Sequence, residues 1–174
     1  MDYFISDLHL WHRNIVGHKF EDKRRKFNRI EDMHSEIISK WNEVVNKTDT
    51  VYVLGDITFG SKEMTKNILK GLKGNKIMIR GNHDQKSAQW YMDCGFKEVW
   101  SKPVIYNDNV ILSHEPVKWE HILYNDMFNI HGHLHNEKIG GRYINVACEW
   151  VDYKPKSIKE IELDMELSRI YIDI

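Results

Sequence analysis

The sequence predicts an α/β fold, and this expectation rests on three observations about the order of its elements. Short apolar runs with strand character recur along the chain. In the first half they alternate with longer segments of helical periodicity, which is typical of β-α-β units and a largely parallel sheet covered by helices. In the second half, two apolar runs flank Asn107-Asp108-Asn109, a hairpin signal that predicts partly antiparallel strands there.

Seven segments are predicted to be strands: residues 3–5, 51–54, 77–79, 104–106, 110–112, 127–130 and 143–146. The longest helical pattern starts after Asn28, where Glu31 completes a predicted capping box, and its apolar face includes Ile37 and Trp41. Two further helices are predicted over residues 61–72 and 87–94, and Gly95 closes the second. Residues 156–167 fit both a helix and a partial alternation, so both interpretations stay open.

Length and composition predict one ordinary globular domain spanning residues 1–174. Hydrophobic residues make up 41% of the chain and charged residues 29%, and no apolar run approaches the ~20 residues of a membrane span. The first residues lack the pattern of a signal peptide, which predicts a cytoplasmic protein. Cys94 and Cys148 form no Cys-x-x-Cys pair, so neither a disulfide framework nor a thiolate zinc site is expected.

The formal net charge of -1 gives no whole-chain basic excess of the kind that drives general nucleic-acid binding. One local exception is the stretch from Lys19 to Arg29, in which six basic residues accompany two phenylalanines. Because Glu21 and Asp22 interrupt this stretch, a solvated connection before the long helix is the favoured interpretation. A surface that follows a polyanion backbone is the alternative.

Side chains that can bind metal ions follow five of the predicted strands, at the point where each strand ends. In chain order these segments are Asp7-Leu8-His9, Gly55-Asp56, Gly81-Asn82-His83-Asp84, His114, and Gly132-His133-Leu134-His135. In open α/β sheets the strand ends form one rim, and ligand sites lie in the crevice outside it. One Gly-Asp or one histidine in such a place is usually a turn or surface residue. Five at the same kind of position predict a shared site.

This series resembles the calcineurin-like metallophosphoesterase family, because five motifs occur in the family's order and span residues 5–135. The tail, with Asn145-Val146 and Tyr153-Lys154-Pro155, is similar to the end of compact bacterial and phage members. The resemblance implies a single metallophosphoesterase domain built as a two-sheet α/β sandwich flanked by helices. Its metal site is expected at the carboxyl ends of the strands.

The resemblance also implies two divalent metal ions, with Asp56 bridging them. One set of ligands is Asp7, His9, Asp56 and His135, and the other is Asp56, Asn82, His114 and His133. A carboxylate suits the bridge because it can offer one oxygen to each cation, whereas a neutral imidazole or amide serves only one. Oxygen and nitrogen ligands without thiolate favour Mn²⁺, and they also suit Fe²⁺, Zn²⁺, Co²⁺ or Ni²⁺.

The implied activity is hydrolysis of a phosphate ester, and the predicted substrate is a phosphodiester. Two metals roughly 3.5 to 4 Å apart can hold a hydroxide between them for in-line attack at phosphorus, so no protein nucleophile is needed. The resemblance makes His83 the general acid that protonates the leaving alkoxide. The alternative for His83 is a supporting position behind the ligands.

The chain departs from the serine/threonine phosphatases of the family after Asp56, where the segment 57–60 reads Ile-Thr-Phe-Gly and lacks their second acidic residue and arginine. A protein-phosphatase role is therefore disfavoured. Because the second acidic residue is absent, Asp84 or a backbone carbonyl is expected to orient the imidazole of His83. Asp84 is therefore assigned to the catalytic group together with His83.

Three residues after the first motif, His12, Arg13 and Asn14, are similar to small phage-type members and could meet the substrate phosphate. The start of a capped helix would look the same. His131 lies beside the last ligand pair but on the predicted strand, so it is expected to be a buried histidine with its hydrogen bonds satisfied.

The predicted partner is a small phosphate ester or a nucleotide, and no membrane is expected. A nuclease, for which the stretch from Lys19 to Arg29 is the only hint, and a phosphomonoesterase are the enzymatic alternatives. A non-catalytic scaffold of the same fold is disfavoured because every ligand position and His83 are present.

Overall fold

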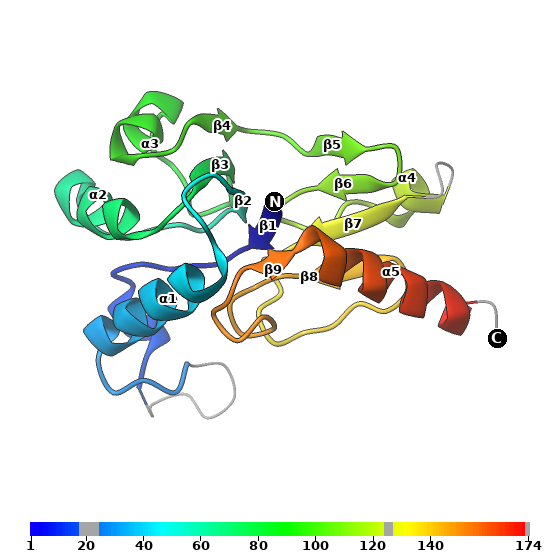
Figure 1. Ribbon diagram of the computed structural model, residues 1–174, viewed down its shortest axis with the longest axis horizontal. Coiled ribbons are helices and arrows are strands. Elements are labelled where there is room, and N and C mark those ends of the chain that lie inside the picture. Colours follow the sequence, from blue (N-terminus) through cyan, green and yellow to red (C-terminus); the bar gives the residue numbers. More distant parts are fainter. Residues whose placement is uncertain (18–24, 124–126, 173–174) are drawn as a thin grey trace.

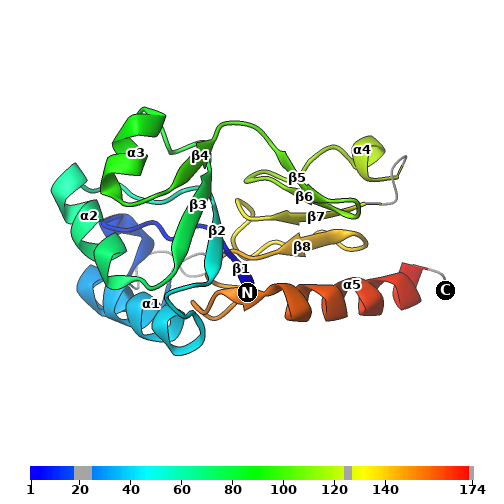
Figure 2. The same cartoon turned by 45° about the horizontal axis from the view of Figure 1, so that its top comes forward.

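Two β-sheets pack against each other at the centre of the molecule, with helices outside them (Figures 1 and 2). The computed structural model describes residues 1–17, 25–123 and 127–172. In the first sheet the strand order is β4-β3-β2-β1-β9, and in the second it is β5-β6-β7-β8. This arrangement confirms the predicted two-sheet α/β sandwich.

The strands of the first sheet are β1 (Asp2–Ile5), β2 (Thr50–Leu54), β3 (Asn75–Ile79), β4 (Glu98–Trp100) and β9 (Lys156–Ser157). The strands of the second sheet are β5 (Val104–Asn107), β6 (Val110–Leu112), β7 (Phe128–His131) and β8 (Tyr143–Asn145). The strands β1 to β4 pair in parallel, and only β9 runs antiparallel to its neighbour in that sheet. In the second sheet β5 and β6 form the predicted hairpin, whereas β6, β7 and β8 are parallel.

The central strands are apolar on both faces because each face is covered. Val51 and Val53 of β2 contribute to a core with the helices, whereas Leu54 contributes to the core between the two sheets. Alternate side chains of a strand point to opposite faces, so one short strand serves two cores. This double burial explains why β1 and β2 read as continuous apolar runs rather than as alternating ones.

The helices α1 (Ile30–Val44), α2 (Lys62–Gly71) and α3 (Ala88–Cys94) lie outside the first sheet (Figure 2). The helix α5 (Ile158–Ile172) runs beside β8, and its Ile161 and Met165 enter the core between the sheets. A short helix, α4 (Trp119–Leu123), precedes β7. No helix in the described ranges is long and apolar enough to cross a membrane.

Capping residues in the sequence predict the starts of the two shorter helices correctly, whereas the predicted start of α1 differs from the structure. Ser61 and Ser87 are the N-caps of α2 and α3, and each side chain accepts a hydrogen bond from the backbone three residues later. The predicted capping box at Asn28 is wrong, because α1 starts at Ile30 with Arg29 at the cap position and no side-chain cap hydrogen bond. The packing of the apolar face of α1, which includes the fully buried Trp41, fixes this helix instead.

The segments that the sequence did not resolve are short or exposed. The strand β4 has only three residues, two of them exposed, so its alternation is too brief to stand out. For residues 156–167 two interpretations were open, and the helix is confirmed: α5 contains every residue of this range from Ile158 onward, after β9 pairs with β1 over two residues.

Candidate metal centre

The segments that follow β1 and β2 stay hydrogen-bonded to each other beyond the ends of their strands. The backbone N–H of Asp7 donates to the carbonyl of Gly55 at 3.0 Å, and that of His9 donates to the carbonyl of Asp56 at 2.9 Å. Asp7, His9 and Asp56 all have left-handed backbones, with φ of 57°, 48° and 53°. Such conformations cost about 1–3 kcal/mol each in non-glycine residues and cluster at functional sites.

Each of the two buried carboxylates is held through one oxygen and open at the other. Asp7 is fully buried, and its Oδ2 accepts a hydrogen bond from the backbone N–H of His133 at 2.9 Å. Its Oδ1 has no hydrogen-bond partner among the described residues. In Asp56, Oδ1 accepts from the backbone N–H of His83 at 3.0 Å, while Oδ2 lies 3.6 Å from Nε2 of both His9 and His114.

The imidazoles of His9, His114 and His135 follow the same rule, since one ring nitrogen is engaged and the other is presented to the centre. Nδ1 of His114 donates to the carbonyl of Leu54 at 2.8 Å. Nδ1 of His9 lies 3.2 Å from Nδ1 of His12, and Nδ1 of His135 lies 3.1 Å from the carboxylate of Glu149. Partners of this kind fix the tautomer and the orientation of a metal-binding histidine.

Three further polar atoms meet on the other side of the centre. The Asn82 Oδ1 lies 2.9 Å from Nε2 of His114 and 3.1 Å from Nδ1 of His133, and the two imidazole nitrogens are 3.2 Å apart. Because His114 donates through Nδ1, its neutral ring can only accept at Nε2, and the amide oxygen of Asn82 also only accepts. Acceptors packed this closely need a proton or a cation between them.

The donor set fits divalent cations. The ligand atoms of Asp7, His9 and His135 all lie within 4.8 Å of one another, and so do those of Asp7, Asp56 and His114. Nε2 of His9 is buried without a partner among the described residues, as is Oδ1 of Asp7. An unsatisfied buried polar atom costs about 1–3 kcal/mol, and a cation bound between two such atoms removes that cost. All seven predicted ligands therefore lie around one centre.

The electrostatics favour the protonation states that metal ligands need at Asp7 and His9, whereas the hydrogen bond to Glu149 raises the pKa of His135 and favours its protonated ring. Burial alone would raise the pKa of the Asp7 carboxyl, but the neighbouring imidazoles of His9, His114 and His135 outweigh burial and lower it. Burial lowers the pKa of His9 and so favours its neutral ring. Ionised carboxylates and neutral imidazoles are the forms that bind a cation.

Asp84 holds the backbone of the loops rather than the ring of His83. Its Oδ2 accepts from the backbone N–H groups of Asp56 at 2.7 Å and Gly81 at 2.8 Å. Its Oδ1 accepts from the backbone of Ile57 at 3.1 Å and from the hydroxyl of Tyr91 at 3.3 Å. Among the described residues, the imidazole of His83 is not one of the donors to Asp84. The contacts of Asp84 thus position the segment that carries Asp56, and they differ from the expected orienting role.

His83 lies at the open side of the centre. Its side chain is 49% exposed, and its Nε2 lies 3.9 Å from Oδ2 of Asp56. Its ring centroid lies 5.4 Å from that of Phe59, whose side chain is itself 45% exposed. A substrate can therefore reach His83, whereas His9 and His114 are buried behind it.

The residues after the first motif occupy different surroundings. The His12 ring stacks on Phe59 with centroids 4.1 Å apart, and burial lowers its pKa to about 4, so it is neutral at neutral pH. Arg13 and Asn14 are exposed at the start of the short 3-10 helix Arg13–Ile15. His131 is fully buried as expected, but only its Nδ1 has a partner, the carbonyl of Gly132, and the expectation that both nitrogens are satisfied is wrong for the described residues.

Arg25 and Glu149, which sequence reasoning did not assign to the site, form its support. The guanidinium of Arg25 is fully buried and donates to the backbone carbonyls of Asp7 and Leu8. It also donates to the Glu149 carboxylate at 2.8 Å, and the same carboxylate oxygen lies 3.1 Å from Nδ1 of His135. Burial would raise the pKa of Glu149, but Arg25 and His135 lower it to about 2.

The position of Arg25 corrects the interpretation of the basic stretch from Lys19 to Arg29 for this one residue. Both interpretations, a solvated connection and a polyanion surface, require an exposed side chain, and Arg25 is 2% exposed. Lys26 and Arg29 are exposed, whereas residues 18–24 lie outside the described ranges. An arginine among charged neighbours gives no local sign of burial, and its partner Glu149 is 124 residues away in the chain.

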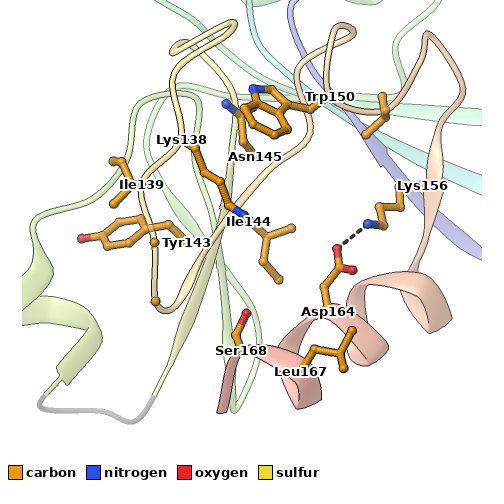
Figure 3. A pocket seen from close by; sticks show the side chains of 13 residues that line it. Lys138, Ile139, Tyr143, Ile144, Asn145, Trp150, Lys156, Asp164, Leu167 and Ser168 are labelled. Carbon is orange, nitrogen blue, oxygen red and sulfur yellow. Dashed lines mark hydrogen bonds and ion pairs between the residues drawn. The ribbon is translucent and has the colours of Figure 1, made fainter. Parts of the chain in front are cut away.

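One cavity lies beside the metal centre, and another lies beside β8. One of about 440 Å³ is lined by Asn82 and His114 and extends from the metal centre. The other, about 480 Å³, lies between β8 and α5, where Lys156 and Asp164 form an ion pair (Figure 3). The second cavity contains none of the predicted site residues, so only the first is continuous with the centre.

A two-sheet α/β sandwich that gathers carboxylate, amide and imidazole donors at its strand ends defines a metallophosphoesterase fold. The family model described as calcineurin-like phosphoesterase matches residues 3–163. The chain belongs to this family, whose members are typically hydrolytic phosphoesterases that bind divalent metals.

Several known proteins are similar to this chain. Uncharacterized protein MJ1445 of Methanocaldococcus jannaschii is 31% identical, over 97% of this chain and 93% of that protein. Gene 66 protein of Mycobacterium phage L5 is 29% identical, over 82% and 81% of the two chains. The solved structure of the protein of unknown function AQ665 from Aquifex aeolicus has 31% identity and a TM-score of 0.73, covering 93% of this chain and 97% of that one.

We expect Gly132→Ala to disrupt the centre, because an added Cβ would lie 2.0 Å from Oγ of Ser6 and 2.3 Å from Oδ2 of Asp7. The free energy of unfolding, measured by urea denaturation, should fall by about 1–3 kcal/mol, as is typical of overpacking. Gly140→Ala is the matched control, since its Cβ would meet nothing within 4 Å. Equal stability of the two variants would contradict the close packing of Gly132 against Asp7.

We expect Glu149→Gln to weaken Mn²⁺ binding by about 10–100-fold, the usual effect of losing a partner that orients a metal-binding histidine. The change removes the charge that Arg25 and His135 share but keeps the size of the side chain. Calorimetric titration of the metal-free protein measures the affinity, and circular dichroism checks that the variant is folded. Glu63→Gln, on the exposed face of α2, is the control. Wild-type affinity in the Glu149 variant would refute the support role.

Proposed function

We propose that this protein hydrolyses phosphodiesters with two divalent metal ions bound at the centre. One ion would be held by Asp7, His9, Asp56 and His135, and the other by Asp56, Asn82, His114 and His133. The observation that carries the proposal is the convergence of open donor atoms, five of them on side chains whose other polar atom is held by a hydrogen bond: Asp7, His9, Asp56, His114 and His135. Preorganised donors of this kind bind a cation without further ordering of the chain.

The bridge is proposed at Asp56 through Oδ2 alone, rather than through one oxygen to each cation as expected, because the backbone N–H of His83 engages Oδ1. Oδ2 lies at the same distance from the open nitrogens of both ligand sets, 3.6 Å from Nε2 of His9 and of His114. Bound divalent cations would polarise the phosphate oxygens and lower the pKa of the attacking water. Mn²⁺ is the proposed metal, since the donors are oxygen and nitrogen without thiolate. The other first-row ions that suit such ligands, Fe²⁺, Zn²⁺, Co²⁺ and Ni²⁺, are alternatives to test beside it.

His83 is proposed as the general acid. Its backbone N–H is tied to Oδ1 of Asp56, and its ring remains half exposed with Nε2 3.9 Å from the other oxygen of that carboxylate. A proton on Nε2 would then be placed beside the centre and within reach of the oxygen that leaves. His12, neutral at neutral pH, would contribute a hydrogen bond to the substrate or to His9 rather than a positive charge.

Preference for a diester is proposed because there is room for an organic substituent on two sides of the centre. On one side the exposed ring of Phe59 lies beside His83. On the other, a cavity of about 440 Å³ starts at Asn82 and His114. A phosphodiester carries two such substituents and a monoester only one. Phe59 also occupies the segment in which serine/threonine phosphatases of the family carry an acidic residue and an arginine.

We expect the Mn²⁺-loaded protein to hydrolyse bis(p-nitrophenyl) phosphate with a higher kcat/KM than p-nitrophenyl phosphate. Release of p-nitrophenolate measures both reactions, and metal analysis should find two ions per chain. Removal of the metal with a chelator should abolish hydrolysis, and adding Mn²⁺ should restore it. A higher kcat/KM for the monoester would make the protein a phosphomonoesterase, and activity that survives chelation would remove the metals from the reaction.

We expect His83→Ala to lower the rate on an alkyl or nucleoside phosphodiester by ~10²- to 10⁴-fold, the usual contribution of a general acid. The same variant should lose little rate on an activated aryl ester, because a phenolate leaves without a proton. Metal content should remain unchanged in the variant. Equal losses on both substrates, or loss of an ion, would show that His83 binds metal or phosphate and is not the acid.

A further inference from the structure

The cavity beside Asn82 and His114 lies where the two sheets are joined. It is lined by the end of β3, by the link from β4 to β5, by the segment after β6 and by α4. The lining includes Arg80, Asn82, Lys102, His114, Glu115 and Lys118. The strands β4 and β5 are the edge strands of their sheets, and the link between them crosses from one sheet to the other (Figures 1 and 2). One end of this cleft is therefore made of proposed metal ligands, and the rest of it leads away from them.

The cleft is locally basic in a chain whose formal net charge is -1. Arg80, Lys102 and Lys118 contribute three cations to its lining, and Glu115 contributes the one carboxylate. Both lysines are exposed, and no carboxylate of a described residue forms an ion pair with either of them. Cations that are not neutralised and that line a cleft attract anionic ligands.

Arg80 gives the cleft a fixed cation. Its Nε donates to the backbone carbonyl of Asp84 at 3.0 Å, and its Nη2 donates to the same oxygen. The carbonyl that holds Arg80 belongs to the residue whose carboxylate holds the backbone of Asp56. The guanidinium is therefore positioned by the same loop that positions the proposed bridging ligand, and it loses little freedom when an anion binds.

The two sides of the centre differ, and this difference predicts how the substrate is oriented when it binds. His83, the proposed acid, lies with Phe59 and does not line the cleft, so the leaving oxygen would depart on the Phe59 side. Asn82 and His114 line the cleft, so the substituent that remains on the phosphate would extend into it. The basic lining then meets the retained part of the substrate.

We infer that Arg80, Lys102 and Lys118 form a subsite for a second phosphate group, carried by the substituent that stays attached to the scissile phosphate. This inference rests on the proposed phosphodiester hydrolysis and narrows its substrate class. The substrate class is then a phosphodiester with a further phosphate on the retained side, of which nucleotides are the test case. A charge-assisted contact from arginine or lysine is the usual way in which proteins bind such a group.

The test compares two substrates that differ only in the second phosphate: the 5′-(p-nitrophenyl phosphate) of thymidine and its 3′-phosphorylated counterpart. Both release p-nitrophenolate and retain the nucleoside. In the Mn²⁺-loaded wild-type protein the 3′-phosphate should raise kcat/KM by about tenfold, which corresponds to about 1.4 kcal/mol. In the double variant Lys102→Ala/Lys118→Ala this ratio should fall toward one. Lys70→Ala, on the exposed surface of α2, should keep the wild-type ratio.

A binding measurement separates failure of the subsite from failure of the proposed function. Calorimetry of the Mn²⁺-loaded protein compares thymidine 3′,5′-bisphosphate with thymidine 5′-monophosphate and needs no turnover. If neither ester is hydrolysed but the bisphosphate binds about tenfold more tightly, and this difference is lost in the double variant, the subsite stands and the proposed function fails. If both esters are hydrolysed with equal kcat/KM and the two nucleotides bind equally, the subsite is refuted and the proposed function stands.

Discussion

The centre depends on a single constraint: five of the seven predicted ligand side chains have one polar atom fixed by the protein and one left open. Asp7 and Asp56 each give one carboxylate oxygen to a backbone N–H, and His114 gives one ring nitrogen to the carbonyl of Leu54. The fixed atoms determine where the open atoms point. Because these bonds join segments far apart in the sequence, the geometry of the centre depends on the packing of the two sheets.

This constraint explains the unusual backbone around the centre. Residues in left-handed conformations recur there, including His133 and His135 with φ of 67° and 45°. Their cost is offset by bonds such as those from Asp84, whose carboxylate receives three backbone N–H groups from two loops. The same closeness leaves no room for a side chain at Gly81, where an added Cβ would lie 2.3 Å from Oδ1 of Asp56. The short contact distances thus explain why glycine, and no larger residue, stands beside the predicted ligands.

The sequence predicted the fold and the gathering of the ligands because both depend on local patterns. Apolar runs marked most strands, and ligand-type residues at their ends share one edge of the sandwich by the geometry of parallel strands. The supports could not be predicted in this way. Arg25 and Glu149 meet only because the chain folds, and nothing near either residue distinguishes it from a surface charge. The roles of Asp84 and His12 likewise depend on which donors lie within 3 Å or so of them, and no spacing rule contains that information.

The net charge of the chain is close to zero, but its charged residues are unevenly distributed over the structure. A net charge of -1 describes the whole chain, yet Arg80, Lys102 and Lys118 line one cleft with a single carboxylate among them. These three residues come from three separate segments that are brought together at the edge where the sheets are joined, so no basic run in the sequence indicates them. The conspicuous basic stretch, by contrast, includes an arginine that is buried and paired. Electrostatic recognition depends on the local potential of a cleft rather than on the sum over the chain. Net charge therefore bears on nonspecific binding to nucleic acid, whereas selection of an anionic ligand depends on the lining of the cleft.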